Sequence, residues 1–208
     1  MDASPKSRRF ANGARSRLLS LADRVEVLTR STGRAFVDRD ATLARALVAQ
    51  GGEHQRLRSA LDEAWSDVLV PGNEHAAKDV PVNANLVHSL QTILSLVGTI
   101  CEHVMSVTAG TPPLHGTAIE QLAEMVPNLL RDAVSALRRN DPAYAAEVLR
   151  SAIAVDACFA QTYLDLLQVV RQDGDHMERA QRLHVVSRAL ERIGDNASEI
   201  AGGVPLPA

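Results

Sequence analysis

The chain has 208 residues, of which 46% are hydrophobic and 3% aromatic, so it can bury a core built mainly from Ala, Leu, Val and Ile. The formal net charge of −3 gives the protein as a whole no electrostatic basis for binding nucleic acid, and Lys6, Arg8 and Arg9 form only a short basic patch. Cys101 and Cys158 lie far apart in apolar stretches without metal-ligand spacing, which predicts two buried thiols in a reducing compartment.

Membrane and export signals are not expected in this chain. Apolar runs fall short of the roughly 20 residues that a membrane-spanning helix needs, and the N-terminus lacks the apolar core of a signal peptide. The sequence therefore predicts a soluble, cytoplasmic protein with no segment inserted in a membrane.

Helix start and stop signals recur along the chain and strand signals are nearly absent, so the sequence predicts an all-α protein with six long helices. Residues 1–12 are expected to form a flexible tail, and the first helix is predicted over residues 15–37. Asp40 is placed to cap a second helix that continues to residue 70, with a weak point at Gly51-Gly52. A third helix is predicted over residues 83–110.

Three further helices follow, each opened by a predicted N-cap. The caps are Thr117 with Glu120, Asp141 followed by Pro142, and Asp175 with Glu178. Pro127 is expected to kink the fourth helix, because it lacks an N–H group and its ring clashes with the preceding turn. Gly174 is predicted to end the fifth helix.

The two halves of the chain resemble each other. The segment LADRV at residues 21–25 resembles LAEMV at residues 122–126, and LSLVGT at residues 94–99 aligns with LERIGD at residues 190–195. This period predicts two tandem three-helix bundles, one over residues 13–110 and the other over residues 115–203. A glycine recurs within the last helix of each half, at Gly98 and Gly194, which indicates close helix approach.

Glu191 and Asp195 are one helical turn apart on the last helix, so their like charges face the same way. Two interpretations remain open. A bound cation can offset the repulsion, or Arg188 and Arg192 can pair with the two carboxylates on a solvated face. His176 and His184 lie on the same helix without the spacing of a metal clamp, and they are predicted to be surface residues.

Catalytic signatures are absent from the sequence. It has no Gly-rich phosphate loop, no G-x-S-x-G motif, no His-Glu-x-x-His motif and no Glu-x-x-His pair of the di-iron type. We therefore do not expect an enzyme.

The last helix, RALERIGDNASEIA at residues 188–201, resembles the third-helix signature of the PhoU family of phosphate-signalling regulators. The resemblance extends back through DAVSAL at residues 132–137, the turn at Asn140-Asp141 and the pair Val155-Asp156. The first half matches in layout and hydrophobic pattern only. The family resemblance implies two three-helix repeats, each ending in a Glu/Asp-x-x-x-Asp motif that can hold metal ions, and it implies a homodimer.

By this resemblance, Glu191 and Asp195 would hold a divalent metal or iron in the second repeat, with Asp156 contributing from the neighbouring helix. Two carboxylates alone do not fill a coordination sphere, so oxygens from Asp156, water or a second subunit would be needed. Ser95 and Thr99 stand at the equivalent positions of the first repeat. A hydroxyl is a poor substitute for a carboxylate, so the metal site of the first repeat is expected to be lost.

The resemblance implies a negative regulator of phosphate uptake and phosphate-responsive signalling that acts by protein–protein contact. Its expected partners are the ATPase subunit of a phosphate ABC transporter and the sensor kinase of the phosphate response. Two alternatives are kept. One is a carboxylate metal-binding helical protein with an enzymatic or metal-storage role, and the other is a companion protein of another phosphate transporter.

Overall fold

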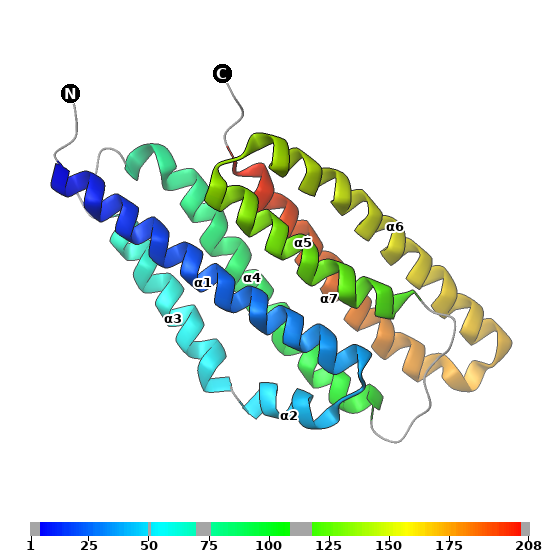
Figure 1. Cartoon of the computed structure of the whole chain (residues 1–208). Coiled ribbons are helices and arrows are strands. Elements are labelled where there is room, and N and C mark those ends of the chain that lie inside the picture. The colour runs from blue at the N-terminus through cyan, green and yellow to red at the C-terminus, as the bar shows by residue number, and fades with distance from the viewer. Residues whose placement is uncertain (1–4, 50, 70–75, 109–117, 205–208) are drawn as a thin grey trace.

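The computed structural model describes residues 5–49, 51–69, 76–108 and 118–204, and these residues form helices without any strand (Figure 1). The elements are α1 Pro5–Val37, α2 Ala41–Ala49, α3 Gly51–Val68, α4 Ala76–Thr108, α5 Ile119–Arg139, α6 Pro142–Gln172, the 3₁₀ turn η1 Gly174–His176, and α7 Met177–Gly202. The predicted all-α class is confirmed. The architecture agrees with six long helices in tandem, except that the second helix is divided into α2 and α3.

The long helices run side by side along one elongated bundle (Figure 1). The two halves meet through α1 and α4 of the first half and α5 and α7 of the second. In contrast, α3 and α6 lie on opposite outer sides, and within the described residues each packs against helices of its own half. The central helices therefore share one core, and α3 and α6 each keep one face outward.

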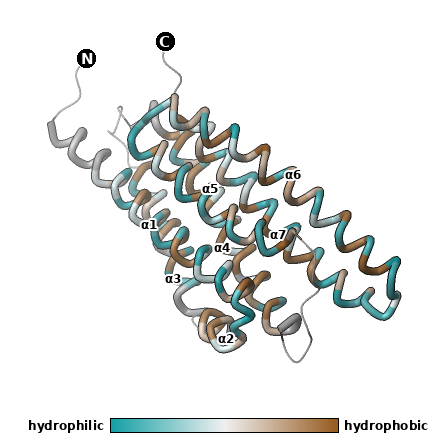
Figure 2. Tube along the Cα trace, turned by 45° about the vertical axis from the view of Figure 1, so that its right-hand side comes forward, coloured by the Kyte–Doolittle hydropathy of each residue, from teal (hydrophilic) through white to brown (hydrophobic). Residues whose placement is uncertain are grey.

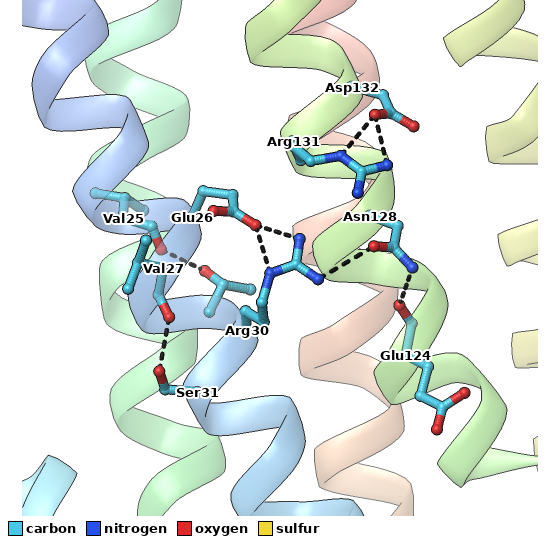
Figure 3. Close-up of polar contacts among 10 residues, drawn as sticks. Val25, Glu26, Val27, Arg30, Ser31, Glu124, Asn128, Arg131 and Asp132 are labelled. Carbon is cyan, nitrogen blue, oxygen red and sulfur yellow. Dashed lines mark hydrogen bonds and ion pairs between the residues drawn. The ribbon is translucent and has the colours of Figure 1, made fainter.

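The core consists of aliphatic side chains from all the helices, and brown and teal segments alternate along the amphipathic helices in Figure 2. The largest fully buried side chains include Leu18, Leu57, Leu90, Leu130 and Ile193. At the joint between the halves, Arg30 of α1 binds the carboxylate of Glu26 and donates to Asn128 Oδ1 of α5 at 3.2 Å (Figure 3). Packing and polar contacts both hold the halves together.

The turns after the first helix of each half have the same geometry, which supports the predicted duplication. Arg39 (φ 54°) and Asn140 (φ 51°) both adopt the left-handed conformation. The residue after each of them accepts hydrogen bonds as an N-cap: Asp40 from backbone N–H groups at 2.9 Å and Asp141 from the Tyr144 N–H at 3.1 Å. Both predicted caps are confirmed.

Three boundaries in the first half differ from the prediction. The first helix begins at Pro5, so residues 5–12 are helical and not a flexible tail; proline suits the first turn of a helix. The second predicted helix corresponds to two elements: α2 ends at Ala49, and α3 begins at Gly51, at the predicted weak point. The third begins at Ala76 and includes Pro81, which near a helix start removes only one backbone hydrogen bond.

The second half departs from the predicted caps in two places. Thr117 lies outside the described residues, and the N-cap residue of α5 is Ala118, whose N–H donates to the Asp165 carboxylate of α6 at 2.8 Å. Asp175 is not a cap: Asp173 caps η1 by accepting from the Asp175 N–H at 2.9 Å, and the N-cap residue of α7 is His176. The helix α5 runs through the buried Pro127 without a break.

Two helices are longer and more apolar than expected. By length and composition alone, Val80–Met105 in α4 and Pro142–Gln172 in α6 could each cross a membrane, so the expectation of no such run is wrong. In the bundle, 56% of the α4 segment is buried, compared with only 22% of the α6 segment. The apolar residues of α4 are accounted for by their burial in the core. Most of the α6 segment is not buried, so the core does not account for its apolar residues.

Candidate functional site

The candidate site lies where α6 and α7 approach closely. A Cβ atom at Gly194 would come within 3.2 Å of Val155 Cγ1, so the missing side chain allows the two helices to pack together. This confirms the predicted role of Gly194. The same prediction is wrong for Gly98, where a Cβ would meet no atom within 4 Å. The close approach places Asp156 of α6 beside the acidic turn of α7.

Glu191 is the most buried of the three predicted ligands, with its side chain 19% exposed. Arg188 Nη1 lies 3.4 Å from Glu191 Oε2 and 3.5 Å from Oε1, so the predicted ion pair is present. Oε2 is nevertheless buried without a hydrogen-bond partner. The second predicted pair does not form, because Arg192 makes no ion pair with Asp195 in the described part of the chain.

The three carboxyl groups act on one another electrostatically. Burial, followed by repulsion from Asp195 and Asp156, raises the pKa of Glu191, although Arg188 opposes this shift. Burial and repulsion from Asp156 and Glu199 likewise raise the pKa of Asp195. Asp156, Glu191 and Asp195 thus repel one another, and together they are called the acidic group.

The chemistry of this acidic group suits a hard cation, because carboxylate oxygens are the ligands that divalent metals and iron accept. The buried Oε2 of Glu191 also accepts no hydrogen bond, so a cation could bind this oxygen without displacing a hydrogen-bond donor. However, no three His, Cys, Asp or Glu side chains among the described residues are arranged to hold a metal ion. The residue types fit a cation, and the side chains would have to turn toward one another to bind it.

We expect Asp195→Asn to raise the melting temperature at pH 7 by about 1–2 °C, since removing a like-charge helix neighbour is worth roughly 0.2–0.5 kcal/mol. The folded-state pKa of Asp195 is raised, so its proton stabilises the fold, and this contribution is lost as the pH rises above the ordinary carboxyl value of about 4. The gain should therefore vanish below that pH. Calorimetric melts in chelator at both pH values test this, and an equal gain at both would contradict it.

In the first half, the positions equivalent to the two carboxylates hold hydroxyl groups, and an arginine contacts one of them. Ser95 and Thr99 occupy the motif positions on α4, and Arg58 Nη2 of α3 donates to Ser95 Oγ at 2.6 Å. One turn away, Gln91 Nε2 donates to Asp62 Oδ1 at 2.6 Å. A guanidinium facing a hydroxyl repels a cation, which agrees with the predicted loss of the first metal site. The sequence did not single out Arg58, because it lies far from the motif.

Aromatic contacts fix the neighbourhood of Arg188. The His184 ring packs against Phe159 and Tyr163, with centroid distances of 6.5 and 5.6 Å. The Arg188 guanidinium lies over the Phe159 ring at 5.6 Å. His184 is therefore half-buried and not the surface residue that was predicted. The side chain of His176 is 42% exposed, and its Nε2 lies 3.7 Å from the Asp173 carboxylate.

The prediction that both cysteines are buried thiols is confirmed. Cys101 and Cys158 are both buried and free, and burial raises the pKa of both thiols. Neither thiol lies in the acidic group.

These features define a class of protein: a tandem helical bundle in which one half keeps an acidic turn and the other has lost it. Residues 119–204 match the PhoU domain family model. This match covers most of the second half of the chain and supports the family resemblance that the sequence predicted.

The relatives cover both halves. A phosphate-specific transport system accessory protein PhoU homologue from Burkholderia sp. is 24% identical over 169 residues, which is 78% of this chain and 71% of the relative. The homologue from Pseudomonas putida is 24% identical over 191 residues, covering 90% of this chain and 74% of the relative.

Solved structures share the fold. The crystal structure of PhoU from Pseudomonas aeruginosa superposes with a TM-score of 0.80 at 21% identity, covering 95% of this chain and 96% of the other. The phosphate transport system regulatory protein PhoU from Streptococcus pneumoniae gives a TM-score of 0.75 at 12% identity, covering 95% and 94%. The first half of this chain therefore has the family fold even though its motif has diverged.

Proposed function

We propose that this protein is a cytoplasmic accessory regulator of phosphate transport that works by protein–protein contact and not by chemical turnover. The observation that carries the proposal is the match of residues 119–204 to the PhoU domain family, together with relatives named as phosphate-specific transport system accessory proteins. Its partners are the ATPase subunit of a phosphate ABC transporter and the sensor kinase of the phosphate response. It acts as a homodimer and restrains phosphate uptake and signalling.

The acidic group of Asp156, Glu191 and Asp195 gives this regulator a cation site in its second repeat. Two observations support this part of the proposal: the buried Oε2 of Glu191 accepts no hydrogen bond, and the pKa values of Glu191 and Asp195 are raised. A bound cation would compensate for both. Cation occupancy changes partner choice only if the metal binds one partner-bound state more tightly than the other.

The direct test is affinity capture with the tagged full-length chain from phosphate-replete and phosphate-starved cells. We expect the transporter ATPase and the sensor kinase to be recovered, in a ratio that changes with phosphate supply. Binding of each purified partner by biolayer interferometry then checks direct contact. Recovery of neither partner under either condition, with no direct binding, would contradict the proposed function.

The same capture separates the two alternatives. A metal-storage or enzymatic protein would hold metal without recovering either partner. A companion of another transporter would recover that transporter in place of the ABC ATPase.

A further inference from the structure

The outward face of α6 is apolar along most of its length. Ile153 is 67% exposed and Leu164 57% exposed, and the neighbouring positions on the same face are also exposed. The spacing of three and four residues places this set, the α6 stripe, on one side of the helix. The stripe consists of Leu149, Ile153, Ala157, Ala160, Leu164 and Leu167.

The fold itself does not require this apolar face, as the other outer helix demonstrates. On the opposite side of the bundle, α3 also packs against its own half and turns one face outward (Figure 1). That face is polar, and its exposed positions include Gln55, Ser59, Asp62 and Ser66. The α6 stripe therefore needs an explanation outside the single chain, since large exposed apolar surfaces mark interaction sites.

The apolar surface continues from the stripe onto α7. A groove of about 170 Å³ lies between the two helices beside Leu167, and Tyr163 and Met177, which line it, are both exposed. A contact that covered the α6 stripe alone would bury a narrow strip of surface. A contact that covered both the stripe and the groove would bury more, closer to the total of about 1,200–2,000 Å² that stable interfaces typically bury.

The order of side-chain sizes along the stripe identifies the occupant. Read in either direction, the stripe has two large residues, two alanines and two large residues. A two-fold axis between Ala157 and Ala160 would bring small residues together where two antiparallel helices cross. The same axis places Ile153 of each copy against Leu164 of the other. Such a self-complementary patch is what a two-fold symmetric contact requires.

The charges along α6 favour the same orientation. In an antiparallel pair, Arg171 in the last turn lies level with the first turns of the other copy, which carry Glu147. A parallel pair would align Arg171 with Arg171. A membrane surface is a poorer match, because the polar sides of α6 carry Glu147, Asp156 and Asp165 and not the predominantly basic residues of an interfacial helix.

We infer that the α6 stripe binds the same stripe of a second copy of this chain, with the two α6 helices antiparallel and crossing at Ala157 and Ala160. This inference rests on the homodimer included in the proposed function and deepens it by giving the dimer a surface and an orientation. The contact leaves the α3 side of each copy free for other partners.

The first experiment measures the mass of the full-length chain by light scattering after size exclusion, at a series of micromolar concentrations. We expect a dimer that Ile153→Glu with Leu164→Glu converts to a monomer, while thermal melts report an intact fold. The matched control, Ser59→Glu with Ser66→Glu on the polar face of α3, should remain dimeric. A monomeric parent, a variant that stays dimeric, or a control that also dissociates would overturn the inference.

The second experiment tests the orientation by disulfide cross-linking. Ile153→Cys mixed with Leu164→Cys should form a covalent dimer, because antiparallel pairing brings these positions together. Either variant alone should not, because its two copies would be separated by 11 residues, or about 16 Å along the helix. The native cysteines are buried and do not compete. Efficient cross-linking of Ile153→Cys alone would overturn the antiparallel arrangement.

A third arm uses phosphatidylglycerol vesicles. Sedimentation of the parent protein with these vesicles, abolished in the Ile153→Glu, Leu164→Glu variant, would show that lipid covers the stripe and would overturn the inference. Capture of the transporter ATPase by a monomeric chain would leave the proposed regulatory role standing and would remove the homodimer and this inference.

Discussion

Glu191→Gln combined with Asp195→Asn is expected to lower the affinity of the chain for Mn²⁺ by at least about 100-fold, since even indirect supports of a metal site are worth 10–100-fold. Amides lack the negative charge that a hard cation requires. A cation would draw together the buried Oε2 of Glu191, which accepts no hydrogen bond, and the neighbouring carboxylates of Asp156 and Asp195. Isothermal titration calorimetry with Mn²⁺ and metal analysis of the purified protein measure the effect.

The matched control lies in the other half of the same molecule. Ser95→Ala with Thr99→Ala alters the equivalent turn of α4, where Arg58 already donates to Ser95, and it should leave Mn²⁺ affinity unchanged. A parent protein that binds no Mn²⁺, or a double amide variant that binds it as tightly as the parent, would remove the proposed cation site.

Gly33→Ala is expected to destabilise the protein by up to about 2 kcal/mol, because overpacking costs about 1–3 kcal/mol and the gain in helix propensity offsets roughly 1 kcal/mol of it. A Cβ atom at this position would lie 2.7 Å from the carbonyl oxygen of Ala123, and a backbone atom cannot move aside as a side chain can. The clash falls between α1 and α5, where the two halves join. Denaturant unfolding measures the change.

Gly98→Ala makes the same substitution in a helix where the added methyl group meets no atom within 4 Å. It should stabilise the protein by up to about 1 kcal/mol through helix propensity alone. Equal effects of the two substitutions would show that the contact between α1 and α5 is looser than the distance to Ala123 indicates.

The sequence predicted the elements whose signals are local. Asp40 and Asp141 are confirmed as caps because an N-cap contacts backbone groups only two or three residues away. The all-α class followed from periodicity in the same way. The predicted tail failed because a sequence without strong apolar periodicity can still continue a helix, as residues 5–12 do.

Features that depend on distant residues were missed. The start of α5 is held by Asp165, which is 47 residues away in the chain, and no local pattern connects the two. Gly33 and Gly98 look alike in sequence, and only the neighbouring helix distinguishes them. The acidic group was partly predictable, because Glu191 and Asp195 share a turn, whereas Asp156 entered only through the family resemblance.

The opposite chemistry of the two halves has a consequence for recognition. The two halves repeat a similar order of helices, so a partner that recognised backbone shape alone would meet similar surfaces on both. The two surfaces differ in charge. Arg58 lies beside Ser95 on one half, and Asp156 lies near Asp195 on the other. A docking protein with complementary charges can therefore bind in only one orientation. The difference between the two motifs makes the bundle polar along its two halves.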